Sequence, residues 1–274
     1  MLSLSRWPLA ARRGITGVMT DIDDTLTADG AIAPAALSAL RALRAAGLTL
    51  IAITGRPAGW SAAFAAEWPL HALVAENGAV AFVPSSEAVD AADPPIRKYY
   101  QQDAATRARN HQRMQAVVAD IQRAIPQARL ASDSNGRECD IAFDHSEHHH
   151  LDAAAIAQVV QRMRQAGMQA TVSSIHINGW FGTHDKWLGA NWIVRQLLGR
   201  ALAQELAQWV YIGDSTNDER MFEHFPNSVG VANIARFAPH MRYLPRYVTR
   251  QARGAGFAEM AHALLAARKT ACNA

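Results

Sequence analysis

Two aspartates separated by one residue, Asp21 and Asp23, directly follow an apolar run at positions 15–19. That run predicts a short buried β-strand that delivers both carboxylates to its end. Carboxylates this close repel each other, and each is unstable in a buried position without a partner. A bound cation would stabilise the pair, and one carboxylate could then act as a nucleophile while the other donates a proton. The segment alone also fits an acidic turn that caps a helix.

A second polar segment follows a strand expected at 48–53 and consists of a hydroxyl, a glycine and a cation: Thr54, Gly55 and Arg56. Pro57, directly behind it, suits the first turn of a helix. A hydroxyl, a flexible backbone and free N–H groups at a helix start can cradle an anion. An ordinary strand-to-helix turn would have the same composition.

A third segment places Lys186 in the first turn of an expected helix. The helix dipole disfavours a cation there, so a nearby anion would account for it, although a lone lysine is usually a solvated surface residue.

A fourth segment brings Asp214 and Asp218, with Asn217 between them, to the end of a strand expected near 208–212. Oxygen-rich carboxylate clusters suit Mg²⁺, and the same acids also fit a helix cap.

Taken together and in this order, the four segments resemble the motifs of the haloacid dehalogenase superfamily of phosphotransferases. The matching residues are Asp21-x-Asp23-x-Thr25-Leu26, Thr54, Lys186 and Gly213-Asp214-x-x-Asn217-Asp218. The spacing resembles the class IIB, Cof-like branch, in which a large cap lies between the second and third motifs. The segment Glu76-Asn77-Gly78 resembles the one that precedes this cap. Asp24 departs from the glycine of many members, although an acid there also occurs in the family pattern.

This resemblance implies a role for each motif residue. Asp21 would attack phosphorus and form an aspartyl-phosphate, and Asp23 would protonate the leaving oxygen and then deprotonate the hydrolytic water. Thr54 and Lys186 would hold the phosphoryl oxygens. The implied Mg²⁺ site comprises Asp21, Asp23 through its backbone carbonyl, Asp214 and, in support, Asp218. Further contacts to the substrate are expected from Gly55, Arg56, Asn77 and Asn217, the last of which would orient Lys186 or the metal shell.

The activity implied by the resemblance is that of a Mg²⁺-dependent phosphatase acting on a small phosphorylated metabolite, with a sugar phosphate as the favoured substrate. A phosphomutase of the phosphomannomutase type shares this cap class, and release of inorganic phosphate would separate the two activities. A non-catalytic binding protein on the same scaffold is a third alternative, against which the intact acids argue. A dehalogenase is not expected, since it needs no acidic metal cluster. The sequence identifies neither the substrate nor the oligomeric state.

The composition excludes several classes of partner. The chain has 274 residues, of which 50% are hydrophobic, enough for a large core. Its net charge of +3 comes without a dense Lys/Arg block, so we expect no nucleic-acid partner. No run approaches the roughly 18 apolar residues of a membrane span, and the two cysteines form no disulfide framework. We therefore expect a cytoplasmic protein without a membrane partner, in which residues 1–14 form a loose tail.

The elements that position these motifs alternate between strand and helix. Strands are expected at 15–20, 48–53, 72–75, 208–212, 227–231 and 246–249, and helices at 34–46, 58–66 and 257–268. This pattern predicts an α/β fold, a Rossmann-like, doubly wound parallel sheet with helices on both faces. Asn77-Gly78 predicts a hairpin that leads into a strand at 79–83.

A Pro- and Ala-rich stretch at 84–95 indicates a boundary, after which the pattern changes. Two successive units of helix, strand and strand follow, with helices at 103–124 and 152–166 and strands at 128–132, 138–143, 169–173 and 175–181. The interpretation is a catalytic core of residues 1–83 and 183–274 with an inserted α+β cap at 84–182.

The cap must provide specificity, because the four motifs contain few groups that could bind more than a phosphate. Candidate contacts are polar residues at its predicted hairpins: Asn135, Arg137, Glu138, Ser173, Ser174, His176 and Asn178. Strand alternation puts Ser174, His176 and Asn178 on one face, and a half-solvated sheet face would look the same. Asn135-Gly136 is first of all a hairpin turn.

Overall fold

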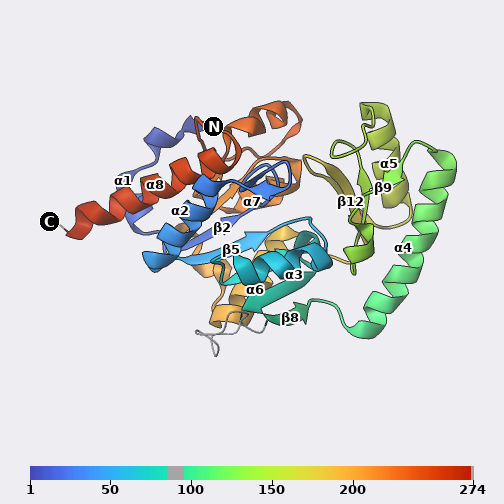
Figure 1. Ribbon diagram of the computed structural model, residues 1–274, viewed down its shortest axis with the longest axis horizontal. Coiled ribbons are helices and arrows are strands. Elements are labelled where there is room, and N and C mark those ends of the chain that lie inside the picture. The colour runs from blue at the N-terminus through green and yellow to red at the C-terminus, as the bar shows by residue number, and fades with distance from the viewer. Residues whose placement is uncertain (85–95, 273–274) are drawn as a thin grey trace.

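The computed structural model describes residues 1–84 and 96–272, which form two lobes (Figure 1). The larger lobe is built on a sheet in the order β1-β15-β14-β13-β2-β5-β6-β7-β8. In that order the strands span Leu2–Ser3, Tyr247–Val248, Ser228–Gly230, Trp209–Gly213, Gly17–Thr20, Thr49–Ile53, Ala72–Ala75, Val80–Pro84 and Ile96–Tyr100. The strands from β1 to β6 run parallel, while β7 and β8 are antiparallel to their neighbours at one edge.

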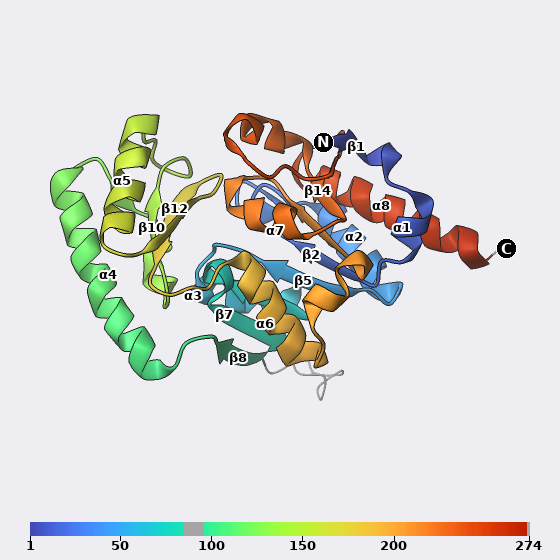
Figure 2. The ribbon, with the colours of Figure 1, turned by 180° about the vertical axis from the view of Figure 1, so that it is seen from behind.

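Helices cover both faces of this sheet (Figures 1 and 2). One face carries α1 (Leu9–Arg13), α2 (Pro34–Ala45), α3 (Ala58–Glu67) and α8 (Arg253–Cys272), and the other carries α6 (Lys186–Leu198) and α7 (Glu219–His224). Successive side chains of a strand point to opposite faces, so Leu50 packs under the first helix layer and Ile51 under the second. Burial on both faces explains the continuous apolar runs of the central strands.

The smaller lobe has its own hydrophobic core between two helices and an antiparallel sheet in the order β11-β12-β10-β9. Its helices are α4 (Ala104–Ala124) and α5 (Ala153–Gln165), and its strands in sheet order are Gln169–Val172, His176–Trp180, Ile141–Asp144 and Arg129–Leu130. A short hairpin of β3 (Thr27–Ala28) and β4 (Ala31–Ile32) belongs to the larger lobe. Short 3₁₀ helices are η1 Leu4–Arg6, η2 Glu76–Gly78, η4 Ser134–Gly136, η5 Leu202–Gln204, η6 Leu206–Gln208, η7 Thr216–Asp218, η8 Ala232–Arg236 and η9 Ala238–His240.

The predicted α/β fold class is confirmed, and the two successive units of helix, strand and strand form the smaller lobe. Strand β8 was not predicted, and it extends the larger sheet beyond residue 84. The smaller lobe therefore begins after Tyr100 in the structure. The predicted boundaries of the cap at residues 84 and 182 stay a prediction. Except for Pro84, the predicted boundary segment lies outside the described residues.

The N-terminal segment is part of the larger lobe, so the prediction of a loose tail is wrong. Strand β1 pairs in parallel with β15, and Trp7 is 1% exposed. The indole Nε1 of Trp7 donates a hydrogen bond to Asn227 at 3.1 Å, and its ring stacks on Tyr247 with centroids 5.6 Å apart. The N-terminal segment is too short to show a hydrophobic periodicity in sequence. Its position depends on the side chain of Trp7, which packs against Tyr247 of the distant strand β15.

The segment Asn135-Gly136 also differs from its predicted hairpin turn. It lies in η4, within a longer connection between β9 and β10. Within the described residues, no helix is both long and apolar enough to cross a membrane.

Candidate active site

The predicted motif residues come together at one edge of the larger sheet. Asp21 follows β2, Thr54 follows β5 and Asp214 follows β13, and these strands are neighbours. The carboxyl ends of parallel strands meet at the same edge of a sheet, which is where ligands bind in open α/β folds. Lys186 enters from the first turn of α6.

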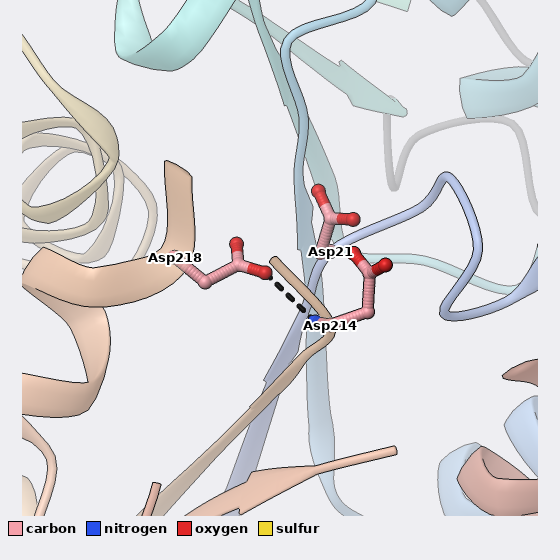
Figure 3. Close-up of side chains that lie close together, drawn as sticks. All are labelled: Asp21, Asp214 and Asp218. Carbon is pink, nitrogen blue, oxygen red and sulfur yellow. Dashed lines mark hydrogen bonds between the residues drawn. The ribbon is translucent and has the colours of Figure 1, made fainter. Parts of the chain in front are cut away.

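Three buried carboxylates form an acidic cluster. Oxygen atoms of Asp21, Asp214 and Asp218 lie within 4.8 Å of one another (Figure 3). The ammonium group of Lys186 donates to Asp21 Oδ1 at 2.6 Å and to Asp218 Oδ1 at 2.7 Å. A single lysine charge cannot balance this many carboxylates, so the cluster attracts further positive charge.

The pKa values follow from this crowding. Burial raises the pKa of Asp21 to about 8, and Lys186 acts in the opposite direction. Burial, together with Asp21 and Asp218, raises the pKa of Asp214 well above its usual range. Burial alone would lower the pKa of Lys186, but the carboxylates beside it raise that pKa above its usual range. A cation bound among these acids would lower the pKa of each carboxyl group.

Asp214 offers a free ligand atom. Its Oδ2 accepts a hydrogen bond from Asn233 Nδ2 at 3.1 Å, whereas its buried Oδ1 has no hydrogen-bond partner among the described residues. A buried acceptor without a partner is unfavourable. Carboxylate oxygens are the ligands that Mg²⁺ prefers in proteins, so this donor set fits a hard divalent cation.

Asp218 stabilises the acidic cluster through several hydrogen bonds. Besides Lys186, its carboxylate accepts hydrogen bonds from the hydroxyl of Tyr211 at 2.5 Å and from the backbone N–H groups of Asp214 at 2.9 Å and Ser215 at 3.2 Å. Beside it, Asn217 Oδ1 accepts a hydrogen bond from Ser215 Oγ at 3.0 Å. These contacts fix the turn that carries Asp214 and hold the lysine in place.

Asn233 is a site residue that the sequence analysis missed. Its side-chain amide donates to Asp214 and to the backbone carbonyl of Asp24 at 3.0 Å, and so links two motif loops. It follows β14, the strand beside β13. The rule that polar residues at the ends of parallel strands converge would have identified it.

The two motif aspartates have different partners. Arg56 Nε lies 3.0 Å from both carboxylate oxygens of Asp23, whereas Asp21 is bonded to Lys186. Thr54 is buried, and its hydroxyl oxygen accepts from the backbone N–H of Arg56 at 3.1 Å. Two carboxyl groups in different environments can take different chemical roles.

Arg56 also joins the two lobes. Its Nη2 lies 2.9 Å from Glu147 Oε1, and its Nη1 lies 3.5 Å from Asp133 Oδ2. The other oxygen of Glu147 is 2.8 Å from His176 Nε2. The hydrogen bond from His176 and the charge of Arg56 lower the pKa of Glu147 to about 2, against the effect of burial. Nothing in the sequence of its loop distinguished Glu147.

Glu147→Gln is expected to lower the melting temperature at pH 6, because Arg56 and His176 then lose an ionised partner. A carboxyl group whose pKa is lowered on folding stabilises the protein above its unfolded pKa near 4.5. That contribution falls as the pH drops toward 2. Calorimetry of both proteins between pH 7 and pH 3 should therefore show a difference in melting temperature that shrinks below about pH 4.5. A difference independent of pH would contradict an ionic role.

Glu76 forms a second junction between the lobes. It is fully buried, with φ of 48°. Its carboxylate accepts backbone N–H groups from Ala58 in the larger lobe and from Glu138, Cys139 and Asp140 in the smaller lobe, at 2.5 to 3.1 Å. Burial, with Asp140 nearby, raises the pKa of Glu76 to about 8, and the N–H donors act in the opposite direction.

The predicted cap residues lie at the same junction. Arg137 Nη1 donates to the carbonyl of Gly55 at 3.0 Å and to Asp140 Oδ1 at 2.8 Å. Asn178 and Asn77 donate to Asp140 Oδ2 at 3.0 Å and 3.5 Å. Polar atoms of Arg137, Asn178 and His176 are thus engaged by protein partners, and direct contact of these residues with substrate stays a prediction.

The cleft between the lobes is closed. A cavity of about 10 Å³ remains beside Asp21 and Asp23, and Ser174, His176 and Asn178 of the smaller lobe complete its wall. This volume is about that of one water molecule. In this closed arrangement the central cavity has no room for a molecule much larger than water.

Known proteins share part of this sequence and its fold. Residues 18–100 match the sequence model of haloacid dehalogenase-like hydrolases. No curated protein matches the chain. A solved structure of Thermoplasma acidophilum 0175 superposes with a TM-score of 0.67 at 18% identity, over 92% of this chain and 98% of that one.

Two further solved structures share the fold. The sucrose-phosphatase from Synechocystis, in complex with sucrose and phosphate, has a TM-score of 0.63 at 16% identity, over 92% of this chain and 98% of that one. An IMP-nucleotidase from Plasmodium falciparum has a TM-score of 0.57 at 12% identity, over 94% of this chain and 72% of that one. The predicted resemblance is confirmed for residues 18–100, which match the family model, and the chain shares the fold of these three solved structures.

Proposed function

We propose that the protein is a Mg²⁺-dependent phosphatase that hydrolyses a small phosphorylated metabolite through an aspartyl-phosphate on Asp21. The observation that carries this proposal is the buried cluster in which Lys186 lies between Asp21 and Asp218, with Asp214 beside them. Such a site combines a nucleophile with the positive charge that phosphoryl transfer requires, because this reaction depends mainly on positioning and charge stabilisation.

Asp21, Asp23, Thr54 and Lys186 each have a separate role in the proposed two-step hydrolysis. A carboxylate that approaches a phosphate dianion meets a repulsion of roughly 8 kcal/mol at ~4 Å and an effective dielectric near 20. The ammonium group of Lys186 and the N–H groups beside Thr54 offset part of it. Asp21 Oδ then bonds to phosphorus as the ester oxygen leaves with a proton from Asp23. In the second step Asp23 takes a proton from the water that releases phosphate from Asp21.

The cluster of Asp21, Asp214 and the backbone carbonyl of Asp23 would hold Mg²⁺, with Asp218 in support. When bound, the ion supplies positive charge that neutralises the phosphoryl oxygens. The fit rests on the partnerless Oδ1 of Asp214 and on the excess of carboxylates over cations.

Activity is expected to depend on a divalent cation, because Lys186 alone cannot balance the acidic cluster. The assay measures inorganic phosphate released from p-nitrophenyl phosphate and from a panel of hexose phosphates, with MgCl₂ or with excess chelator. We expect turnover with MgCl₂ and a loss of at least about 100-fold with chelator. Full turnover in chelator would refute the metal requirement, and conversion of a hexose phosphate without phosphate release would indicate a mutase.

The sugar phosphate remains the favoured substrate class, and the cytoplasm remains the favoured location. The buried, free thiol of Cys139 is compatible with a reducing compartment.

A further inference from the structure

Two larger cavities flank the closed centre, one on the Asp23 side and one on the Lys186 side. The first has a volume of about 260 Å³ and lies between the loop around Glu147 in the smaller lobe and Arg236 and Arg253 in the larger lobe. The second has a volume of about 280 Å³ and lies beside Lys186 and Asn217. Each could hold the part of a substrate that lies beyond its phosphate.

The linings of these cavities differ. The Asp23-side cavity is lined by carboxylates, guanidinium groups, hydroxyls and His148, and Ile175 is the one large apolar residue in its described lining. The Lys186-side cavity includes the indole of Trp180 and the apolar side chains of Val160 and Val172. The first suits hydroxyl groups, which pair with carboxylates and guanidinium groups, and the second suits an aromatic or apolar group.

The chemistry favours the Asp23 side. Asp23 lines both this cavity and the small central one. A general acid must lie within hydrogen-bond reach of the leaving oxygen, so the leaving group of the substrate lies next to Asp23. The Lys186-side cavity instead adjoins the residues expected to hold the phosphoryl oxygens.

Ser174 provides an independent observation. Ser174 is 4% exposed, and its Oγ has no hydrogen-bond partner among the described residues. The residue lines both the central cavity and the Asp23-side cavity. A buried hydroxyl without a partner is unfavourable. A hydroxyl of a bound ligand at the junction of the two cavities would satisfy it.

We propose that the leaving group occupies the Asp23-side cavity, that Ser174 binds it by a hydrogen bond, and that it is a small polyhydroxylated group of about monosaccharide size. This rests on the proposed phosphatase function. The volume lies just below the roughly 300–1,000 Å³ of pockets that hold drug-sized ligands. Carboxylates and guanidinium groups occur here in nearly balanced number, with Asp24 paired to Arg236 and Arg253, which suits a neutral polyol. The described lining contains no aromatic ring for a nucleobase except the imidazole of His148.

The chain offers a matched pair of variants to test this assignment. Ser174→Ala removes the partnerless hydroxyl of the Asp23 side, and Thr171→Val removes a partnerless buried hydroxyl that lines the Lys186-side cavity. The wild-type protein is expected to have a higher kcat/KM for glucose 6-phosphate or mannose 6-phosphate than for adenosine 5′-monophosphate. Ser174→Ala should reduce kcat/KM for the hexose phosphate by about tenfold, the size of one lost hydrogen bond, and Thr171→Val should leave it unchanged.

Other results would overturn the assignment. A preference for the nucleotide, or a loss in Thr171→Val without one in Ser174→Ala, would place the leaving group on the Lys186 side. Equal losses in both variants would show a general effect on closure. If the wild type hydrolyses none of these esters, the proposed function fails. Calorimetric titration with glucose 6-phosphate then tests which cavity binds the sugar, using Asp21→Asn alone and combined with Ser174→Ala or Thr171→Val. Weaker binding with Ser174→Ala alone would support the assignment, and absent binding or equal binding in both would refute it.

Discussion

Asp21→Asn is expected to abolish turnover, with kcat reduced by at least about 10⁴-fold, the size that follows removal of an essential nucleophile. The amide keeps the shape of the side chain but cannot form the acyl phosphate. Lys186 contacts Asp21 at the end of β2, whereas the neighbouring Asp23 is bonded to Arg56, so we expect no other carboxylate to take the place of Asp21. The measurement combines phosphate release with acid-quenched labelling and peptide mass analysis, which should find phosphate on Asp21 in the wild type and none in the variant.

Two companion variants make this test specific. Asp23→Asn should slow both formation and breakdown of the phospho-enzyme, because its carboxyl group transfers the proton in each step. Asp120→Asn changes an acid that is 51% exposed on α4, and it should retain the full rate. Label on Ser215 or Thr216, with Asp21 unmodified, would refute the proposed intermediate.

Glu76→Ala is expected to produce the largest loss of stability among the variants considered. Its carboxylate accepts four backbone N–H groups, one from Ala58 and three from residues 138–140. Each buried donor left without a partner costs about 1–3 kcal/mol, although water and relaxation recover part of it. We expect the free energy of unfolding, measured in urea, to fall by at least about 3 kcal/mol.

A matched control lies a few residues away. Glu67, at the end of α3, is exposed, and Glu67→Ala should change stability by less than about 0.5 kcal/mol. Glu76→Gln retains one carbonyl acceptor and should fall between the two. A loss in Glu76→Ala no larger than that in Glu67→Ala would mean that the N–H groups find other partners and that this junction contributes little.

The sequence was sufficient to predict that the motif residues come together at the ends of neighbouring strands, whereas their chemical roles stay a prediction. Acids directly behind a buried apolar run, as at Asp21 and Asp214, are unfavourable unless a partner or a ligand stabilises them, and parallel strands bring their ends together. A separate turn signal, Asn77-Gly78, predicted the hairpin that the antiparallel pairing of β6 and β7 confirms. The resemblance to haloacid dehalogenase-like hydrolases added the order of the motifs.

Contacts between distant segments could not be predicted. Glu147 and His176 were ordinary polar residues in sequence, and their pairing with Arg56 exists because the smaller lobe folds over the larger one. Trp7 likewise acquires its role from Asn227 and Tyr247. Periodicity describes local structure, and it carries no information about which residues of a separate lobe will meet a given side chain.

Glu76 accepts hydrogen bonds from the backbone N–H groups of residues 138–140, and the side chains of these residues take no part in those hydrogen bonds. A substitution in that stretch keeps its N–H groups, unless it introduces proline, which has none. The junction therefore constrains the two lobes unequally during evolution. Position 76 must remain an acceptor, whereas these hydrogen bonds alone place no demand on the side chains of the opposite segment, which are constrained by separate contacts of Glu138 and Asp140. A cap can in this way acquire new specificity while it stays docked on an unchanged core.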